Sequence, residues 1–263
     1  MTRRLFVNDV HLRVRDAGDG TPPLLLLHGL GGSLEIWDSL IPHLEKSQRV
    51  IAGDHRGHGG SDKPSGPYSV GLFARDWIAA MDALGIDRAD LLGLSLGGAV
   101  AMRIAADHPS RVRALVLVDT WALPHPDFTA MLRERLAHLS RGDMRAYAEA
   151  AIPQVYSESF RRGHPDAIDA YRARVAEADP ASLRAAVQAA LDHDMRGDLR
   201  RIGAPTLVVV GADDRLTPPF HAEYLGRSVP GAQLVVVPGS GHFPFLEAPR
   251  EFLDAVLPFL RGR

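Results

Sequence analysis

The feature that most constrains the fold is a series of short apolar runs separated by helical patterns. Apolar residues recur at three-to-four-residue spacing between most of the runs, as at Phe73, Trp77, Met81 and Leu84. Such runs are typical of strands that helices cover on both faces, so the sequence predicts an α/β fold with a doubly wound, parallel sheet. The runs occupy residues 24–27, 50–52, 91–92, 114–118, 206–210 and 234–237.

The N-terminal residues have a different pattern. Residues 10–15 alternate apolar and polar side chains, which predicts a strand with one exposed face. Residues 5–7 precede it, so we expect an opening hairpin that turns at Asn8 and Asp9. Those three apolar residues are too few for a signal peptide, and no stretch approaches the roughly 20 apolar residues of a membrane span. We therefore expect a cytoplasmic protein with no membrane partner.

Residues 121–200 contain helical patterns and no predicted strand. We expect this segment to be a helical cap inserted into an α/β core formed by residues 1–120 and 201–263. Asp179 and Pro180 are suited to the N-cap and first turn of one of its helices. The apolar stripes that indicate helices comprise residues 128, 131, 132, 136 and 139, then 168, 171 and 175, then 183, 187 and 191.

A nucleophile motif lies in the middle of the core. Residues 93–97 read Gly-Leu-Ser-Leu-Gly and match G-x-S-x-G. The motif follows the apolar run at 91–92 and precedes a helical stretch at 98–107, which is the strand–turn–helix setting of a nucleophile elbow. Ser95 would then stand at a helix N-terminus, where a developing anion is stabilised. The alternative is a glycine-rich turn with an inactive serine.

A serine nucleophile needs a base and an acid later in the chain. His242 follows the last apolar run and is the candidate base. Asp213 and Asp214 follow the preceding run, and both are candidate acids.

The oxyanion requires two amide donors. We expect them at Leu96, directly after the serine, and at Leu30 in the glycine-rich residues 28–32. A dinucleotide-binding loop is a poor match for residues 28–32, because Leu34 stands where G-x-G-x-x-G requires glycine.

Residues 28–32, residues 54–61, the elbow at Ser95 and the loops of Asp214 and His242 together resemble the α/β-hydrolase superfamily. The resemblance implies an eight-stranded, mostly parallel sheet with a helical cap inserted after the sixth strand. Within the superfamily, residues 66–68 and 82–86 look closest to 3-oxoadipate enol-lactonase-like esterases.

The family pattern favours Asp214 over Asp213 as the acid, because the family acid stands three residues before the Thr of a Thr-Pro pair. Asp119, at the end of the sixth predicted strand, is a third candidate, since some superfamily members keep the acid there. Its alternative role is to cap the start of the helical insert.

Composition excludes several other functions. The 30 Lys and Arg residues nearly balance 32 Asp and Glu residues, and this gives no basic surface for nucleic acid. The absence of Cys removes disulfides, thiolate metal sites and a Cys nucleophile. His55 and His58 have metal-like spacing, but without further ligands nearby we interpret them as solvated loop residues. We interpret His28 as a structural residue of the oxyanion loop. We therefore expect no metal and no cofactor.

The remaining side chains leave two readings open. Trp37, Trp121, Leu123, Phe128 and Phe243 line a substrate pocket or belong to ordinary core, and Phe245 shares this ambiguity. We expect other histidines, including His138, His164 and His193, to be exposed, and Glu247 to belong to the start of the last helix.

The combined pattern predicts a serine hydrolase of ester or lactone bonds in a small, partly apolar substrate. Three alternatives stay open: a carbon–carbon hydrolase, a cofactor-free perhydrolase, and a hydrolase-fold ligand receptor. Serine at the elbow argues against the dehalogenase and epoxide hydrolase members of the superfamily, which use Asp there.

Overall fold

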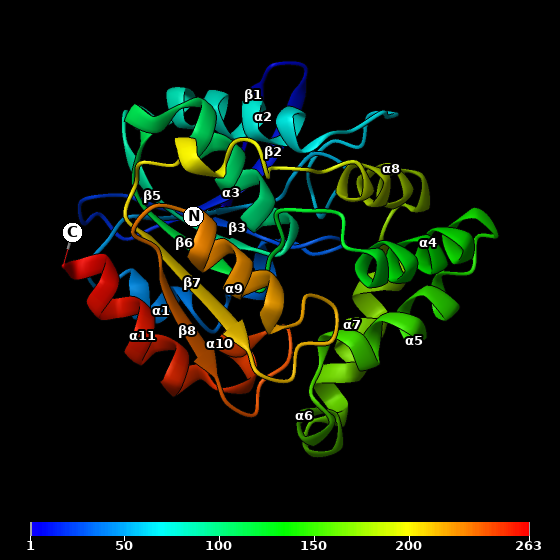
Figure 1. Ribbon diagram of the computed structural model, residues 1–263. Coiled ribbons are helices and arrows are strands. Elements are labelled where there is room, and N and C mark those ends of the chain that lie inside the picture. The colour runs from blue at the N-terminus through cyan, green and yellow to red at the C-terminus, as the bar shows by residue number, and fades with distance from the viewer. Residues whose placement is uncertain (1, 263) are drawn as a thin grey trace.

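In the computed structural model, which describes residues 2–262, eight strands form one sheet (Figure 1). Their order across the sheet is β1-β2-β4-β3-β5-β6-β7-β8. β2 pairs antiparallel with β1 and with β4, and the other neighbours are parallel. The strands are β1 (Thr2–Val7), β2 (Val10–Ala17), β3 (Leu24–Leu27), β4 (Val50–Gly53), β5 (Ala89–Leu94), β6 (Val112–Val118), β7 (Thr206–Gly211) and β8 (Gln233–Val237).

The predicted hairpin and the six predicted runs all lie in strands. Asn8 and Asp9 join β1 to β2, and Asn8 has a φ of 53°, a left-handed conformation that Asn tolerates in tight turns. Every residue of β3, β4, β5 and β7 is buried. This burial explains their continuous apolar character, because helices cover both faces of the sheet.

One strand differs from its prediction. The run at 234–237 was expected to be buried on both faces, but β8 lies at the edge of the sheet and only Val237 is fully buried. Leu234 and Val236 are 38% and 45% exposed. The apolar pattern alone could not distinguish an edge strand from a central one.

The helices of the core form two layers (Figure 1). α2 (Val70–Ala83), α3 (Leu96–Asp107) and α9 (Pro219–Ser228) cover one face. α1 (Ile41–Leu44) and α11 (Pro249–Arg261) cover the other, and the short α10 (Pro244–Glu247) precedes α11. Short 3-10 turns occur at Leu34–Trp37, Pro109–Arg111 and Leu199–Arg201.

Five helices and no strand lie between β6 and β7, and Figure 1 shows them gathered to one side of the sheet. As expected, Asp179 caps the last of them and accepts a hydrogen bond of 2.7 Å from the Ser182 amide. They are α4 (Pro126–Ser140), α5 (Met144–Val155), α6 (Glu158–Gly163), α7 (Pro165–Glu177) and α8 (Pro180–Leu191).

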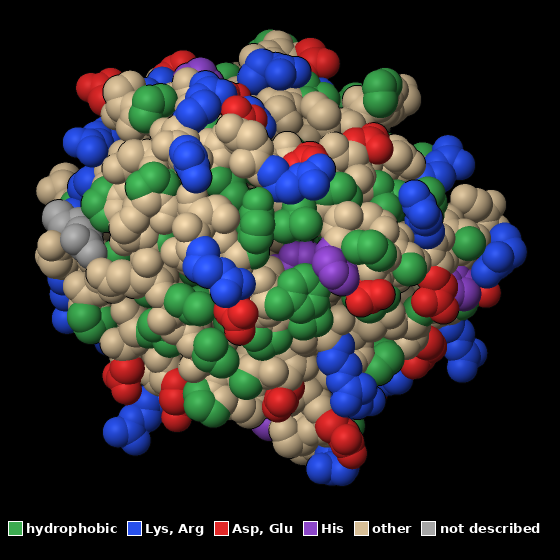
Figure 2. Space-filling view, viewed as in Figure 1, with side chains coloured by type: hydrophobic (Ala, Val, Ile, Leu, Met, Phe, Trp, Pro, Cys, Tyr) green, Lys and Arg blue, Asp and Glu red, His purple; other side chains and the backbone are tan. Residues whose placement is uncertain are grey.

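The surface carries mixed charge. On the face drawn in Figure 2, basic and acidic side chains are interspersed, in agreement with the near balance of charge in the sequence. None of the helices within residues 2–262 has both the length and the apolar character needed to cross a bilayer.

The parallel strands bring distant loops together. β3, β5, β6, β7 and β8 run in one direction, so the loops that follow them meet at one edge of the sheet. Open α/β sheets bind ligands at this carboxyl edge. The candidate catalytic residues all follow these five strands.

Candidate active site

Ser95 stands at a strained turn between β5 and α3. Its φ of 54° and ψ of −117° are unusual for a residue with a side chain. Two hydrogen bonds hold this backbone: the Ser95 amide donates to the Val118 carbonyl at 2.9 Å, and the Thr120 hydroxyl donates to the Ser95 carbonyl at 2.7 Å. The surrounding strands therefore impose the conformation that a nucleophile elbow requires.

The two glycines of the motif permit this turn by their lack of a side chain. A Cβ atom on Gly93 would lie 2.3 Å from the Gly97 carbonyl oxygen, and one on Gly97 would lie 2.0 Å from the Leu27 carbonyl oxygen. No side chain fits at such distances, so the close approach of β3, β5 and α3 depends on both glycines.

His242 and Asp214 form a buried pair. His242 Nδ1 lies 2.7 Å from Asp214 Oδ2, and both side chains are buried. The other oxygen of Asp214 accepts from the amides of Leu216 and Thr217, and the Thr217 hydroxyl donates to Oδ2 at 2.7 Å. A carboxylate can only accept, so Nδ1 carries the proton and Nε2 is the basic nitrogen.

The charge state of Asp214 follows from these contacts. Burial raises its pKa, but the charge and hydrogen bond of His242 and the hydroxyl of Thr217 oppose this, and the net pKa is lowered. Asp213, the alternative acid, is exposed and directs its backbone amide to the Ser240 carbonyl. The structure therefore brings Asp214, and not Asp213, to His242.

Asp119 lies beside this pair. One of its oxygens accepts from the Gly211 amide at 2.9 Å, and the other has no partner among the described residues. Burial and then repulsion from Asp214 raise the pKa of Asp119 well above its usual value. The alternative role as a cap of the insert is wrong, because the side chain bonds to the end of β7 instead.

Asp119, Asp214 and His242 place one ligand atom each within 4.8 Å of one another, as metal ligands would. However, Asp214 and His242 already satisfy each other through a direct hydrogen bond. The arrangement is therefore suited to orienting an imidazole.

A network of histidines and a tryptophan holds the predicted oxyanion loop. His28 Nδ1 donates to the Gly29 carbonyl at 2.7 Å, and His28 Nε2 accepts from the His55 amide at 3.1 Å. His55 Nε2 donates to the His28 carbonyl at 3.0 Å, while its Nδ1 accepts from Trp77 Nε1 at 2.9 Å. Each ring nitrogen has one assigned role, so both imidazoles are neutral and the structural role expected for His28 fits these contacts.

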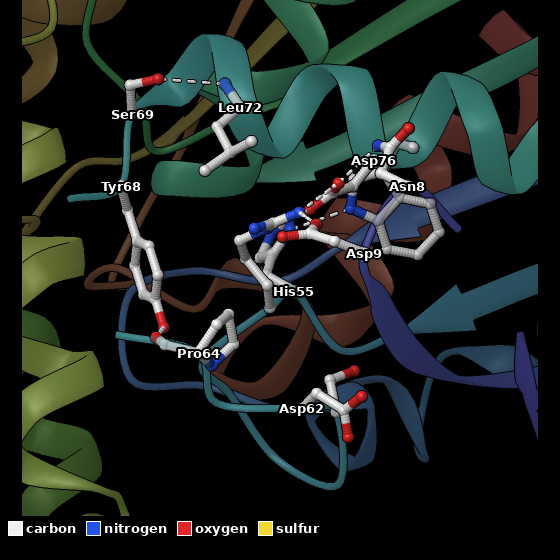
Figure 3. Close-up of polar contacts among 12 residues, drawn as sticks. Asn8, Asp9, His55, Asp62, Pro64, Tyr68, Ser69, Leu72 and Asp76 are labelled. Atoms are coloured by element: carbon white, nitrogen blue, oxygen red, sulfur yellow. Dashed lines mark hydrogen bonds and ion pairs between the residues drawn. The ribbon is translucent and has the colours of Figure 1, made fainter. Parts of the chain in front are cut away.

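The interpretation of His55 and His58 as solvated loop residues is wrong, because both are buried. Burial lowers the pKa of His55 to about 3 and also lowers that of His58. Ion pairs secure their loop: Arg56 bonds to Asp76 and Asp9 near the β1–β2 turn, where Asn8 also bonds to Asp76 (Figure 3).

The candidate pocket residues lie in two groups. Trp37 is buried against Phe245, with ring centroids 4.8 Å apart, and Phe243 lies next to His242. Trp121 packs on Phe128, with centroids 4.6 Å apart. Leu123, between β6 and α4, is half-buried.

Phe128 also lines a cavity of about 720 Å³. Its other lining residues include Met131 on α4, Ser157 before α6, and Asp214 with the neighbouring His221. The cavity therefore extends from α4 to the loop that carries the candidate acid.

The sequence analysis did not predict two contacts that join the helices α4–α8 to the loop that carries His242. The His242 amide donates to the Val155 carbonyl at the end of α5, at 2.8 Å. Glu247 Oε2 accepts from the amides of Gly241 and Ser157 at 3.0 and 3.1 Å. Glu247 ends α10, and the last helix begins at Pro249, so the expectation that Glu247 belongs to the start of that helix is wrong. No sequence motif marks a link of this kind.

The other histidines fall into two sets. His138 is half-buried and His164 is exposed, whereas His193 is buried against Trp121, contrary to the expectation of exposure. Burial lowers the pKa of His193 to about 4. His193 lies just after the end of α8. The apolar periodicity of a helix predicts which residues of that helix are buried, but it does not predict the burial of residues that follow the helix.

Comparison with known proteins identifies the family. A sequence model described as the alpha/beta hydrolase fold matches residues 22–249, and the chain therefore belongs to the α/β-hydrolase family. A relative from Caulobacter sp. (strain K31), RutD, named provisionally as a carbamate hydrolase, is 34% identical over 242 residues, covering 91% of this chain and 90% of its own.

Two solved structures have the same architecture. A hydrolase from Pseudomonas aeruginosa PA01 is 35% identical with a TM-score of 0.91, and the alignment covers 98% of both chains. The enol-lactonase from Burkholderia xenovorans LB400 is 28% identical with a TM-score of 0.93, covering 98% of this chain and 100% of its own. The expected resemblance to enol-lactonase-like proteins is confirmed, and the chain is a hydrolase by family.

Proposed function

We propose that this chain hydrolyses carboxylic esters or lactones through an acyl-enzyme on Ser95. His242 takes the proton of the serine hydroxyl and passes it to the leaving alcohol, and Asp214 holds the imidazole in the required tautomer. Water then releases the acid. The observation that carries this proposal is the 2.7 Å contact between His242 and Asp214 at the carboxyl edge of the sheet that also bears the Ser95 elbow.

The backbone amides of Leu30 and Leu96 stabilise the oxyanion in this mechanism. Leu96 begins α3, where free amides and the helix dipole favour a negative charge. Leu30 follows the Gly29 carbonyl, which His28 holds by a hydrogen bond. Each donor contributes about 3 kcal/mol to the transition state if it behaves like the oxyanion donors of other acyl-transfer enzymes.

We further propose that residues 121–200 form a cap over a core of residues 1–120 and 201–263. The cavity between α4 and the Asp214 loop supports a partly apolar substrate, because Phe128 and Met131 form its helical wall. Phe243, which lies beside His242, is a further candidate for substrate contact, and so are Trp37, Trp121 and Leu123.

The name of the relative RutD, a provisional carbamate hydrolase, supports carbamates as a second candidate class of substrate. A carbamate carbonyl accepts the same attack by serine and generates the same kind of oxyanion. An amide-like nitrogen makes this carbonyl less electrophilic than that of an ester, so the proposed order of reactivity is ester above carbamate.

A substrate panel tests the proposal. The panel contains p-nitrophenyl esters of increasing acyl length, simple lactones and an aryl carbamate, each assayed with the wild type, Ser95→Ala and the exposed-serine control Ser65→Ala. We expect the wild type and Ser65→Ala to hydrolyse esters or lactones, and Ser95→Ala to lose this activity. Full activity in Ser95→Ala, or no hydrolysis of any panel member by the wild type, contradicts the proposal.

A further inference from the structure

Thr217 contacts both members of the candidate acid–base pair. It is fully buried and follows Asp214 by three residues, in the loop between β7 and α9. Its hydroxyl donates to Asp214 Oδ2 at 2.7 Å, and the hydroxyl oxygen lies 3.4 Å from His242 Nδ1. Asp214 Oδ2 therefore accepts from two side chains, the imidazole of His242 and the hydroxyl of Thr217.

The backbone holds the other oxygen of Asp214. Oδ1 accepts from the amides of Leu216 and Thr217, at 2.8 and 3.1 Å. A substitution of Thr217 leaves these amides in place, so the hydroxyl is a donor that can be removed by itself. Because a hydrogen bond donated to a carboxylate favours its charged form, this hydroxyl is suited to keeping the negative charge on Asp214.

Asp119 is the carboxyl group that competes with Asp214 for this charge. The two are buried, and an oxygen of Asp119 lies within 4.8 Å of one of Asp214. One oxygen of Asp119 accepts from the Gly211 amide, and the other has no hydrogen-bond partner among the described residues. Two buried carboxyl groups so close resist carrying two charges, and they take up protons as a pair. The Thr217 hydroxyl adds a donor to one member of this pair.

We propose that Thr217 is a positioning residue for the hydrolytic reaction, because its hydroxyl keeps the negative charge of the carboxyl pair on Asp214 and so keeps an acceptor in place for His242. This inference rests on the proposed hydrolase function and adds one residue to its site. Without the hydroxyl the charge on Asp214 is less stabilised, so the carboxyl pair and the imidazole take up their next proton at a higher pH. Protonation of Asp214 removes the acceptor that fixes the tautomer of the base.

Other ionisable groups surround Asp214 from the neighbouring elements. A substitution of Thr217 leaves each of them in place, so a comparison among Thr217 variants isolates the effect of the hydroxyl. Besides Asp119 and His242, these groups are the buried His221 on α9, Glu247 on α10, the exposed Asp213 and Arg215 in the loop itself, and, across the cavity, Asp127 on α4 and Glu158 on α6.

The pH dependence of kcat/KM for one ester tests the proposal. Thr217→Val removes the hydroxyl and keeps the amide that donates to Asp214. We expect the acidic limb, where activity falls with falling pH, to move up by about one pH unit, while the plateau at higher pH falls by less than about tenfold. A packing defect would instead lower the rate at every pH and leave the limb in place. Thr217→Ser, which keeps a hydroxyl, should restore the wild-type limb.

Thr206→Val is the matched control. Thr206 is also buried, and its hydroxyl donates to the Ala204 carbonyl at the opposite end of β7 from Asp214. We expect this variant to keep the wild-type limb. Asp119→Asn added to Thr217→Val removes the competing carboxyl group and should return the limb towards its wild-type position. If Thr217→Val does not fold, Thr217→Ala removes the same hydroxyl with a smaller side chain. An unshifted limb without the hydroxyl, an equal shift in Thr206→Val, or no return in the double variant overturns the proposal.

An NMR titration of His242 separates this inference from the hydrolase proposal, because it requires no turnover. The imidazole signal is assigned by its loss in His242→Gln and is followed against pH in the wild type, Thr217→Val and Thr217→Ser. We expect the titration midpoint to rise in Thr217→Val and to stay in place in Thr217→Ser. If the midpoint moves in this way but the wild type hydrolyses no ester, the role of the hydroxyl stands and the hydrolase proposal fails. If the three midpoints agree, the proposed role of Thr217 is wrong.

Discussion

Asp119 and Asp214 lie side by side, but only Asp214 bonds to the imidazole of His242, at 2.7 Å. Burial and the charge of Asp214 raise the pKa of Asp119, whereas the contacts from His242 and Thr217 overcome burial and lower that of Asp214. The two neighbouring carboxyl groups thus differ in the direction of their pKa shifts, and only Asp214 is held by the imidazole.

This difference predicts unequal effects of two conservative substitutions. Asp214→Asn should lower kcat by about 10⁴-fold, as replacement of a triad aspartate does elsewhere, because His242 loses the acceptor that fixes its tautomer. Asp119→Asn keeps an acceptor oxygen for the Gly211 amide and leaves the contact between His242 and Asp214 in place, so it should keep kcat within about tenfold. Steady-state kinetics with one ester measures both. A larger loss in Asp119→Asn than in Asp214→Asn would assign the acid to Asp119.

The sequence predicted the parts of this site that depend on strand order. The runs at 206–210 and 234–237 placed Asp214 and His242 after neighbouring parallel strands, and such strands end at one edge. The choice between Asp213 and Asp214 came from family resemblance, because both are aspartates in the same loop and strand order alone does not distinguish them. Their different burial depends on the turn that directs Asp214, rather than Asp213, inward.

The buried neutral His55 predicts sensitivity to acid. Burial lowers its pKa from 6.5 to about 3, so its contribution to stability is complete above pH 6.5 and is lost as the pH falls towards 3. His55→Gln should be less stable than the wild type at pH 7, by about 1–3 kcal/mol, because the Trp77 and His28 contacts are lost. Its free energy of unfolding should fall less between pH 6.5 and 3.

Urea unfolding of both proteins across this pH range measures the difference. The exposed His43→Gln serves as the control and should follow the wild-type curve. If His55→Gln loses as much stability on acidification as the wild type, His55 is not the group responsible.

The close approach at the elbow predicts a large effect of one methyl group. Gly97→Ala would bring a Cβ to 2.0 Å from the Leu27 carbonyl oxygen, which only a shift of α3 away from β3 can relieve. We expect a loss of stability of about 3 kcal/mol or more. Gly203→Ala is the control, because nothing lies within 4 Å of its Cβ. Similar denaturation midpoints for the two variants would show that the elbow is not tightly packed.

The link between Glu247 and two backbone amides predicts a role in holding the histidine loop. Glu247→Ala leaves the amides of Gly241 and Ser157 without their acceptor, and should cost about 1–3 kcal/mol of stability and lower kcat. Glu247→Gln keeps an acceptor oxygen and should stay closer to the wild type. Thermal unfolding and ester kinetics on both variants check this, and equal behaviour of Ala and Gln would exclude the hydrogen-bond role.

The features that sequence reasoning missed share one physical cause. Helical and strand periodicities indicate which positions face inward, but they do not indicate which polar side chains can be buried at such positions. Arg135 on α4 is buried within an apolar stripe, and His55 and His58 are buried in a loop that reads as solvated. Each depends on partners distant in sequence, such as Gln154 for Arg135 and Trp77 for His55.

The central claim is that Ser95, activated by His242, is the nucleophile. Reaction of the wild type with a fluorophosphonate, followed by intact-mass and peptide mass spectrometry, tests it directly. We predict a single adduct on the peptide that contains Ser95, no adduct in Ser95→Ala, and much slower labelling in His242→Gln. An adduct on another residue, or full labelling of Ser95→Ala, contradicts the claim.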